Sequence, residues 1–67
     1  MKGILPLAAM EKLLKKAGAP RVSDDAKRAL AEILEDYADQ ISDKAIKIAQ
    51  HSKRKTVKAG DVKLAVK

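Results

Sequence analysis

The residues best suited to chemistry in this chain are its lysines and arginines, and the chemistry they can perform is the binding of anions. The 67 residues include fifteen of them against nine aspartates and glutamates, which gives a net charge of +6 at pH 7. An excess of this size in so short a chain indicates a polyanionic partner, either nucleic acid or an anionic membrane surface.

These basic residues gather at the two ends of the chain. Residues 1–22 hold five basic residues against one acidic residue, and residues 51–67 hold six against one. The middle, residues 23–50, holds four against seven and is acidic. Each basic end is either a solvated run of charge or part of a binding surface, and the positions of the helices decide between the two.

The residue types that build catalytic or metal sites are scarce in this sequence. There is no cysteine, and the single histidine, His51, has neither a second histidine at ligand spacing nor a nucleophile partner. We therefore expect no enzymatic activity, no metal and no cofactor.

Proline and glycine mark the limits of a first helix. Pro6 suits the first turn of a helix, and apolar residues follow at helical spacing as far as Ala17. Gly18, directly after the last of them, predicts a left-handed stop, and Pro20 cannot resume the helix.

A long second helix and a short third helix follow. Ser23 is a suitable N-cap with two aspartates directly after it, and apolar residues then recur every three or four positions up to His51. The second helix is thus about 28 residues and roughly 42 Å long. After a basic loop at 53–55 and an extended piece at 56–57, a third helix begins near Ala59, and Gly60 weakens it by up to about 1 kcal/mol relative to alanine.

The pattern predicts one all-α domain, residues 1–67, with a core too thin for one chain. A chain of this length buries only about 60% of its unfolded surface, and no disulfide can supplement the core. Two flanking helices of roughly 15 to 18 Å cannot cover the apolar stripe of a helix of roughly 42 Å. We therefore expect an obligate helical dimer in which two long helices cross.

The sequence gives no sign of a membrane protein. No apolar run approaches the roughly 18 residues that span a bilayer, and the stretch at 4–10 is too short and proline-broken for a signal peptide. We expect a cytoplasmic protein with no membrane partner.

Several short motifs occur together in one order and spacing. They are Leu5-Pro6-Leu7-Ala8, Ala17-Gly18-Ala19, Arg21-Val22-Ser23-Asp24-Asp25-Ala26, Ala45-Ile46-Lys47, His51, Arg54-Lys55-Thr56-Val57-Lys58-Ala59 and Asp61-Val62. With these motifs on a short-long-short helical layout, essentially the whole chain resembles an archaeal histone.

The resemblance implies the histone fold, in which two chains form an intertwined, head-to-tail handshake dimer. The loop after the first helix then lies beside the partner chain's loop before the third helix. The resemblance also implies an architectural chromatin protein, bound to the chromosome, that binds, bends and wraps double-stranded DNA with little sequence specificity. The second chain is another copy, or a paralogous histone in a heterodimer.

By the same resemblance, the DNA-binding residues form one basic ridge on the dimer. The expected set is Lys12, Lys15, Lys16, Arg21, Arg54, Lys55, Thr56 and Lys58. Arg21 enters the minor groove at each end of the dimer, and Thr56 of the other chain positions it and binds phosphate.

The resemblance further implies that dimers join into larger assemblies on DNA. It places Ile48, His51 and Asp61 at the contact between dimers, and Gly18 where successive turns of the assembly stack closely. Five residues differ from those usual in the family, namely Lys16, Pro20, Gln50, Lys53 and Gly60.

Plainer interpretations stay open for some of these residues. In these interpretations, Arg54 pairs with Asp61 and only holds the loop. The lysines of the first helix are only solvated in them, and Thr56 only favours an extended loop. Two other functions compete with DNA wrapping: a histone-fold adaptor that recruits proteins, and a basic amphipathic helix at membranes. The basic Arg21 and Lys55 argue against the first, and the acidic long helix argues against the second.

Overall fold

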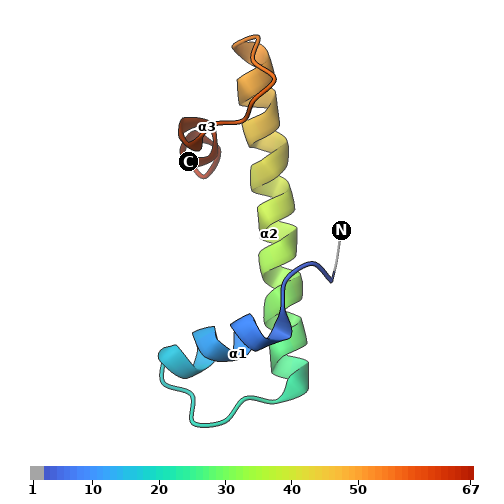
Figure 1. Ribbon diagram of the computed structural model, residues 1–67, viewed down its shortest axis with the longest axis vertical. Helices are drawn as coiled ribbons and strands as arrows, with labels where there is room; N and C mark the ends of the chain where they lie inside the picture. The colour runs from blue at the N-terminus through green and yellow to red at the C-terminus, as the bar shows by residue number, and fades with distance from the viewer. Residues whose placement is uncertain (1–2) are drawn as a thin grey trace. The chain divides into compact units, whose positions relative to one another are not determined.

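The computed structural model describes residues 3–67 and contains three helices in a short-long-short order (Figure 1). They are α1 (Leu7–Lys16), α2 (Asp24–His51) and α3 (Ala59–Ala65), and no residue from 3 to 67 is in a strand. The all-α prediction and its three helices are therefore confirmed. By its internal contacts the chain divides into two compact units, Met1–Asp36 and Tyr37–Lys67.

Helix α1 ends in a left-handed glycine, as the sequence predicts. After the C-cap residue Ala17, Gly18 takes a φ of +119°, a conformation that side chains rarely adopt. The Ala19 N–H donates to the carbonyl of Leu14 (3.1 Å) and the Gly18 N–H to that of Lys15 (3.0 Å). This pair of bonds is a Schellman motif, which satisfies carbonyls that the helix leaves unpaired.

Helix α2 begins at the predicted N-cap. The Ser23 hydroxyl oxygen accepts a hydrogen bond from the Ala26 N–H at 3.1 Å, and Asp24 and Asp25 occupy the first turn. Their negative charge complements the partial positive charge of the helix N-terminus. The helix then runs for 28 residues to His51, the length that the sequence predicts.

Helix α2 ends in a second Schellman motif, in which lysine replaces glycine. The Arg54 N–H donates to the carbonyl of Ala49 (2.9 Å) and the Lys53 N–H to that of Gln50 (2.9 Å). Lys53 is the only non-glycine residue among 3–67 with a positive φ, 58°. A side chain in the left-handed region carries a steric cost. Because lysine stands at a position where glycine is favoured, Lys53 strains the end of α2.

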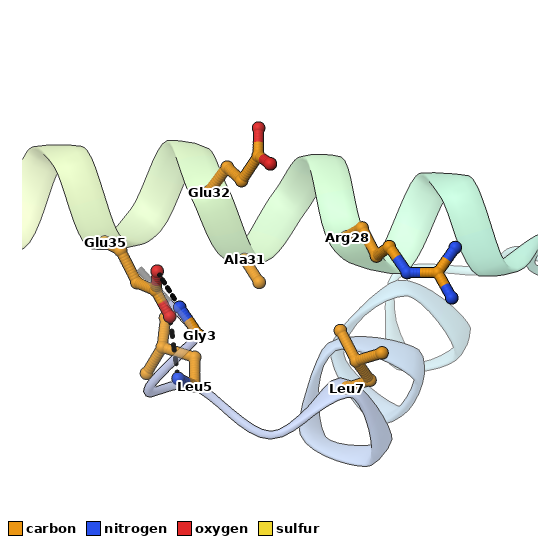
Figure 2. Close-up of a pocket in the computed structure, with 7 residues that line it drawn as sticks. All are labelled: Gly3, Leu5, Leu7, Arg28, Ala31, Glu32 and Glu35. Carbon is orange, nitrogen blue, oxygen red and sulfur yellow. Dashed lines mark hydrogen bonds between the residues drawn. The ribbon is translucent and has the colours of Figure 1, made fainter. Parts of the chain in front are cut away.

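In the first unit a buried carboxylate ties the N-terminal segment to α2. Figure 2 shows the Glu35 side chain, which is only 5% exposed, accepting hydrogen bonds from two backbone amides. The Gly3 N–H lies 2.9 Å from Oε2 and the Leu5 N–H lies 2.8 Å from Oε1. Hydrogen bonds to the charged form, that from Leu5 above all, hold the pKa of Glu35 below its usual 4.5.

The buried apolar residues are few and mostly small. They are Met10 and Ala31 in the first unit and Ala45, Ala49 and Ala65 in the second. Many large apolar side chains are exposed instead, namely Ile4, Leu7, Leu13, Ile33, Tyr37, Ile46, Val57, Val62, Leu64 and Val66. Apolar exposure on this scale is typical of a surface that another chain covers.

We expect Lys53→Gly to stabilise the protein by about 1 kcal/mol per chain, because glycine adopts the left-handed conformation without the steric cost of a side chain. Urea denaturation at one fixed protein concentration measures the change, since stability depends on concentration wherever chains associate. The matched control is Gly18→Lys at the equivalent position of the first motif, which should destabilise the protein at least as much. A loss of stability in Lys53→Gly would contradict this account.

The Glu35 hydrogen bonds predict a specific acid titration. The amide protons of Gly3 and Leu5 should shift together in NMR spectra as the carboxyl protonates, with a midpoint below pH 4.5. Because this pKa is lowered by folding, the contribution of Glu35 to stability is present above about pH 4.5 and is lost as the pH falls through the lower, folded value. Glu35→Gln should abolish the shared titration and Glu32→Gln should leave it; a midpoint at or above about 4.5 would show that the bonds do not form.

Candidate nucleic-acid interface

The first unit presents four cations on the second half of α1 and on the loop that follows. Lys12, Lys15, Lys16 and Arg21 are all exposed. Three of them, Lys12, Lys16 and Arg21, form no ion pair within residues 3–67. Their charges are therefore available to an external anion.

Lys15 belongs instead to a network of ion pairs. Its ammonium lies 3.1 Å from the Glu11 carboxylate, one helical turn away on α1. The same carboxylate lies 2.7 Å from the Lys27 ammonium on α2, and Lys27 also lies 3.2 Å from Asp24. Lys27 and Lys15 both lower the pKa of Glu11, Lys27 more strongly, and Glu11 in turn raises the pKa of Lys27.

In the second unit the loop between α2 and α3 is held by a clamp of Arg54 and Asp61. The Arg54 guanidinium donates to both carboxylate oxygens of Asp61, at 2.7 and 2.9 Å. It also donates to the Thr56 carbonyl at 3.1 Å, and the Lys58 N–H donates to Asp61 at 2.8 Å. Asp61 is only 4% exposed. The loop is thus anchored at its start, its middle and its junction with α3.

The charge on Asp61 is strongly favoured by this clamp. The Arg54 hydrogen bonds, followed by that from the Lys58 N–H, lower the pKa of Asp61 from 3.8 to about 2. Asp61 in turn raises the pKa of Arg54. A two-pronged pair of this kind has fixed geometry as well as charge, so it determines the path of the loop.

The clamp separates the predicted site residues of the loop by role. Arg54 is half-buried and committed to Asp61 and Thr56, as the plainer interpretation of Arg54 expects. Lys55, Thr56 and Lys58 are exposed, and the chain bends at 55–56. The structure thus brings Arg54, Thr56, Lys58 and Asp61 together in one unit.

The residues expected at a contact between dimers occupy different environments. Ile48 is half-buried, His51 is exposed at the last residue of α2, and Asp61 is buried in the clamp. Gly18 forms the left-handed end of α1, and a Cβ atom built there meets no atom within 4 Å. The conformation of Gly18 therefore gives it a role within the chain, apart from any stacking.

Three residues outside the predicted set, Glu11, Lys27 and Glu35, hold elements of the first unit together. The spacing of Glu11 and Lys15, four residues apart on one helix, does signal their pairing. The bond of Glu11 to Lys27 and the capture of the N-terminal segment by Glu35 have no such signal, because each joins elements distant in the sequence. Local spacing cannot reveal contacts of this kind.

Neither a cluster of metal-ligating side chains nor a membrane-spanning helix is found among residues 3–67. Within residues 3–67 no three histidine, cysteine, aspartate or glutamate side chains come together as metal ligands. None of the three helices there combines the length and the low charge needed to cross a bilayer.

The amino-acid sequence was compared with those of known protein families and characterised proteins, and it matches histones. The sequence profile of the family described as histone-like transcription factor (CBF/NF-Y) and archaeal histone matches residues 4–66. The chain is 59% identical over 63 residues to a subunit of the archaeal histone HAN1 of Thermococcus zilligii, and 51% identical over 63 residues to Probable archaeal histone 3 of Methanocaldococcus jannaschii. Each alignment covers 94% of both chains. The chain therefore belongs to the family of archaeal histones and histone-like factors, which are DNA-binding architectural proteins and not enzymes.

Proposed function

We propose that two copies of this chain form one histone-fold domain pair that binds, bends and wraps double-stranded DNA on the chromosome. One observation carries the proposal: exposed cations lie at both ends of the chain, while the carboxylates nearest to them are engaged in ion pairs within the chain. Duplex DNA presents about one negative charge per 1.7 Å, so such a set of cations releases many counterions on binding.

The exposed apolar side chains support the dimer. A hollow of about 460 Å³ opens on the second unit, lined by Ala38, Ile41, Ser42, Ala45, Ile46, Val57 and Val62. The aromatic side chain of Tyr37 is 51% exposed in the single chain. A second copy in a handshake arrangement would cover these residues, and a paralogous histone is the other candidate for the same place. Sedimentation of the purified chain tests the dimer, and a stably folded monomer would overturn it.

In the proposed dimer, the loop after α1 of one chain lies beside the loop before α3 of the other. Arg21 would then enter the minor groove beside Thr56 of the other chain. Lys12, Lys16, Lys55 and Lys58 would bind the phosphate backbone; Lys15, which the sequence also places in this set, is paired with Glu11. The two pairs of loops at the ends of the dimer and the α1 helices between them would form three contact regions. Because the minor groove turns inward about every 10 base pairs, these regions fit roughly 20 to 30 base pairs. Arg54 would contribute by holding the loop.

We propose that sequence specificity is low. The long helix α2 is acidic over its central part, so it is poorly suited to the major groove. Tyr37 is the one aromatic residue in the sequence, which leaves no stacking platform for single strands. Preference among duplexes would come from their bendability.

Larger assemblies are the third part of the proposal. Ile48 and His51, at the end of α2, would meet their counterparts in a second dimer, with Asp61 nearby. Gly18 would permit close stacking of successive turns, because it has no side chain. Nuclease digestion of reconstituted complexes tests this part: fragments that lengthen by one dimer footprint support it, and a single fragment length opposes it.

A salt titration tests the proposed function as a whole. Binding of duplexes of unrelated sequence is measured by electrophoresis at several salt concentrations, and binding of anionic vesicles is measured alongside. We expect similar affinities for all duplexes and a steep loss with salt. Vesicle binding without duplex binding would favour a membrane protein, and binding of neither would favour a protein adaptor.

We expect Arg21→Ala to weaken binding by about 1 to 3 kcal/mol per dimer, a magnitude taken from hydrogen bonds to charged groups. The loss should be similar for unrelated duplexes, because a minor-groove arginine reads no unique base pattern. Lys44→Ala, which removes one positive charge from the acidic part of α2, is the control and should cost much less. A loss confined to one duplex sequence would contradict non-specific binding.

We expect Asp61→Asn to weaken DNA binding although it removes a negative charge, because the loop that carries Lys55 and Thr56 loses its anchor. The clamp stabilises the wild type fully above about pH 4 and is lost as the pH falls toward about 2, since folding lowers the pKa of Asp61. At about pH 3 the wild type should take up most of one additional proton per chain on unfolding, compared with the variant. Asp43→Asn should leave that difference unchanged; tighter DNA binding by Asp61→Asn would refute the anchoring role.

A further inference from the structure

Helix α1 carries two rows of charged side chains that differ in what they contact. Lys12 and Lys16 are four residues apart and form one row, and neither has an ionic partner in the part of the chain described. Glu11 and Lys15 are also four residues apart and form the adjacent row. The second row is bonded to α2 through Lys27, whereas the first is not.

Glu11 is held more firmly than an isolated surface glutamate would be. Its carboxylate lies 2.7 Å from the Lys27 ammonium, whose side chain is only 17% exposed, and 3.1 Å from that of Lys15. Lys27 is itself fixed by Asp24 at 3.2 Å. An exposed pair of Glu11 and Lys15 alone would be weak. The covered Lys27 keeps the carboxylate in place.

The network of Asp24, Lys27, Glu11 and Lys15 is therefore electrically neutral. A phosphate that approached the Lys15 ammonium would be repelled by the Glu11 carboxylate, which lies 3.1 Å from that ammonium. Such a phosphate could displace the Glu11 carboxylate only if the ion pair between Glu11 and Lys27 broke. The row of Lys12 and Lys16 carries no such internal anion and is open to phosphate.

We infer that Glu11 is a positioning residue that withholds Lys15 from DNA and so limits the phosphates neutralised by α1 to those reached by Lys12 and Lys16. The inference rests on the proposed DNA-binding function and refines it, because Lys15 would otherwise count among the phosphate ligands. Glu11 itself touches no DNA in this account. Its effect is to set the salt dependence of binding.

A double-mutant cycle of Glu11→Gln and Lys15→Gln tests this role. The slope of log affinity against log salt concentration is measured for the four proteins on one random duplex. Each phosphate contact adds about 0.9 to that slope. Lys15→Gln should change the slope little in the wild-type background, because Lys15 is already neutralised. Glu11→Gln should steepen it by up to about 1.8 per dimer, which corresponds to up to about 60-fold tighter binding at about 0.1 M salt.

The decisive comparison is Lys15→Gln in the Glu11→Gln background. There it should remove the added slope, because the released Lys15 would be the source of the new contact. Glu32→Gln, which removes the same charge from an exposed position on α2, is the matched control. In that background Lys15→Gln should again have little effect, and Lys12→Gln should lower the slope in every background.

An equal loss of slope on Lys15→Gln with and without Glu11 would overturn the inference while leaving DNA binding intact. Failure of the wild type to bind any duplex would overturn the proposed function instead. A measurement on the wild type covers the case in which Glu11→Gln fails to fold. The carboxyl ¹³C resonance of Glu11 should stay unchanged when duplex is added; a shift on binding would show that Lys15 leaves Glu11 for phosphate.

Discussion

The structure depends on the mismatch between one long amphipathic helix and two short ones. Helix α2 has 28 residues, whereas α1 has 10 and α3 has 7. The short helices bury mainly alanines, and side chains as large as Ile33 and Tyr37 are left exposed. Because exposed apolar area of this kind is costly in water, it favours association with a second chain. The arrangement of basic residues proposed for DNA depends on that association.

Carboxylates also organise the structure, because Glu35, Glu11 and Asp61 each bind donors from other parts of the same chain. Glu35 captures two backbone amides, Glu11 links α1 to α2, and Asp61 closes the loop before α3. Each is surrounded by donors that favour its charged form, and each therefore has a lowered pKa. A basic protein thereby stabilises its own fold with anions while leaving several cations exposed.

The two ends of α2 show how local chemistry supports these contacts. At its start, Ser23 caps the helix and two aspartates oppose the helix dipole. At its end, Lys53 adopts the left-handed conformation, and the chain turns into the loop held by Arg54. The strained lysine and the clamp lie next to each other. The clamp fixes the loop even though the turn before it lacks the favoured glycine.

The three helices, their limits at Gly18 and Ser23, and the segregation of charge can be read from the amino-acid sequence, because caps, breakers and periodicity act between near neighbours. The sequence also indicated the pairing of Arg54 with Asp61 through the family resemblance. Which charges are already paired, such as Lys15 with Glu11, is set by the three-dimensional fold. Ion pairs between helices depend on distances in space, and a linear pattern does not contain those distances.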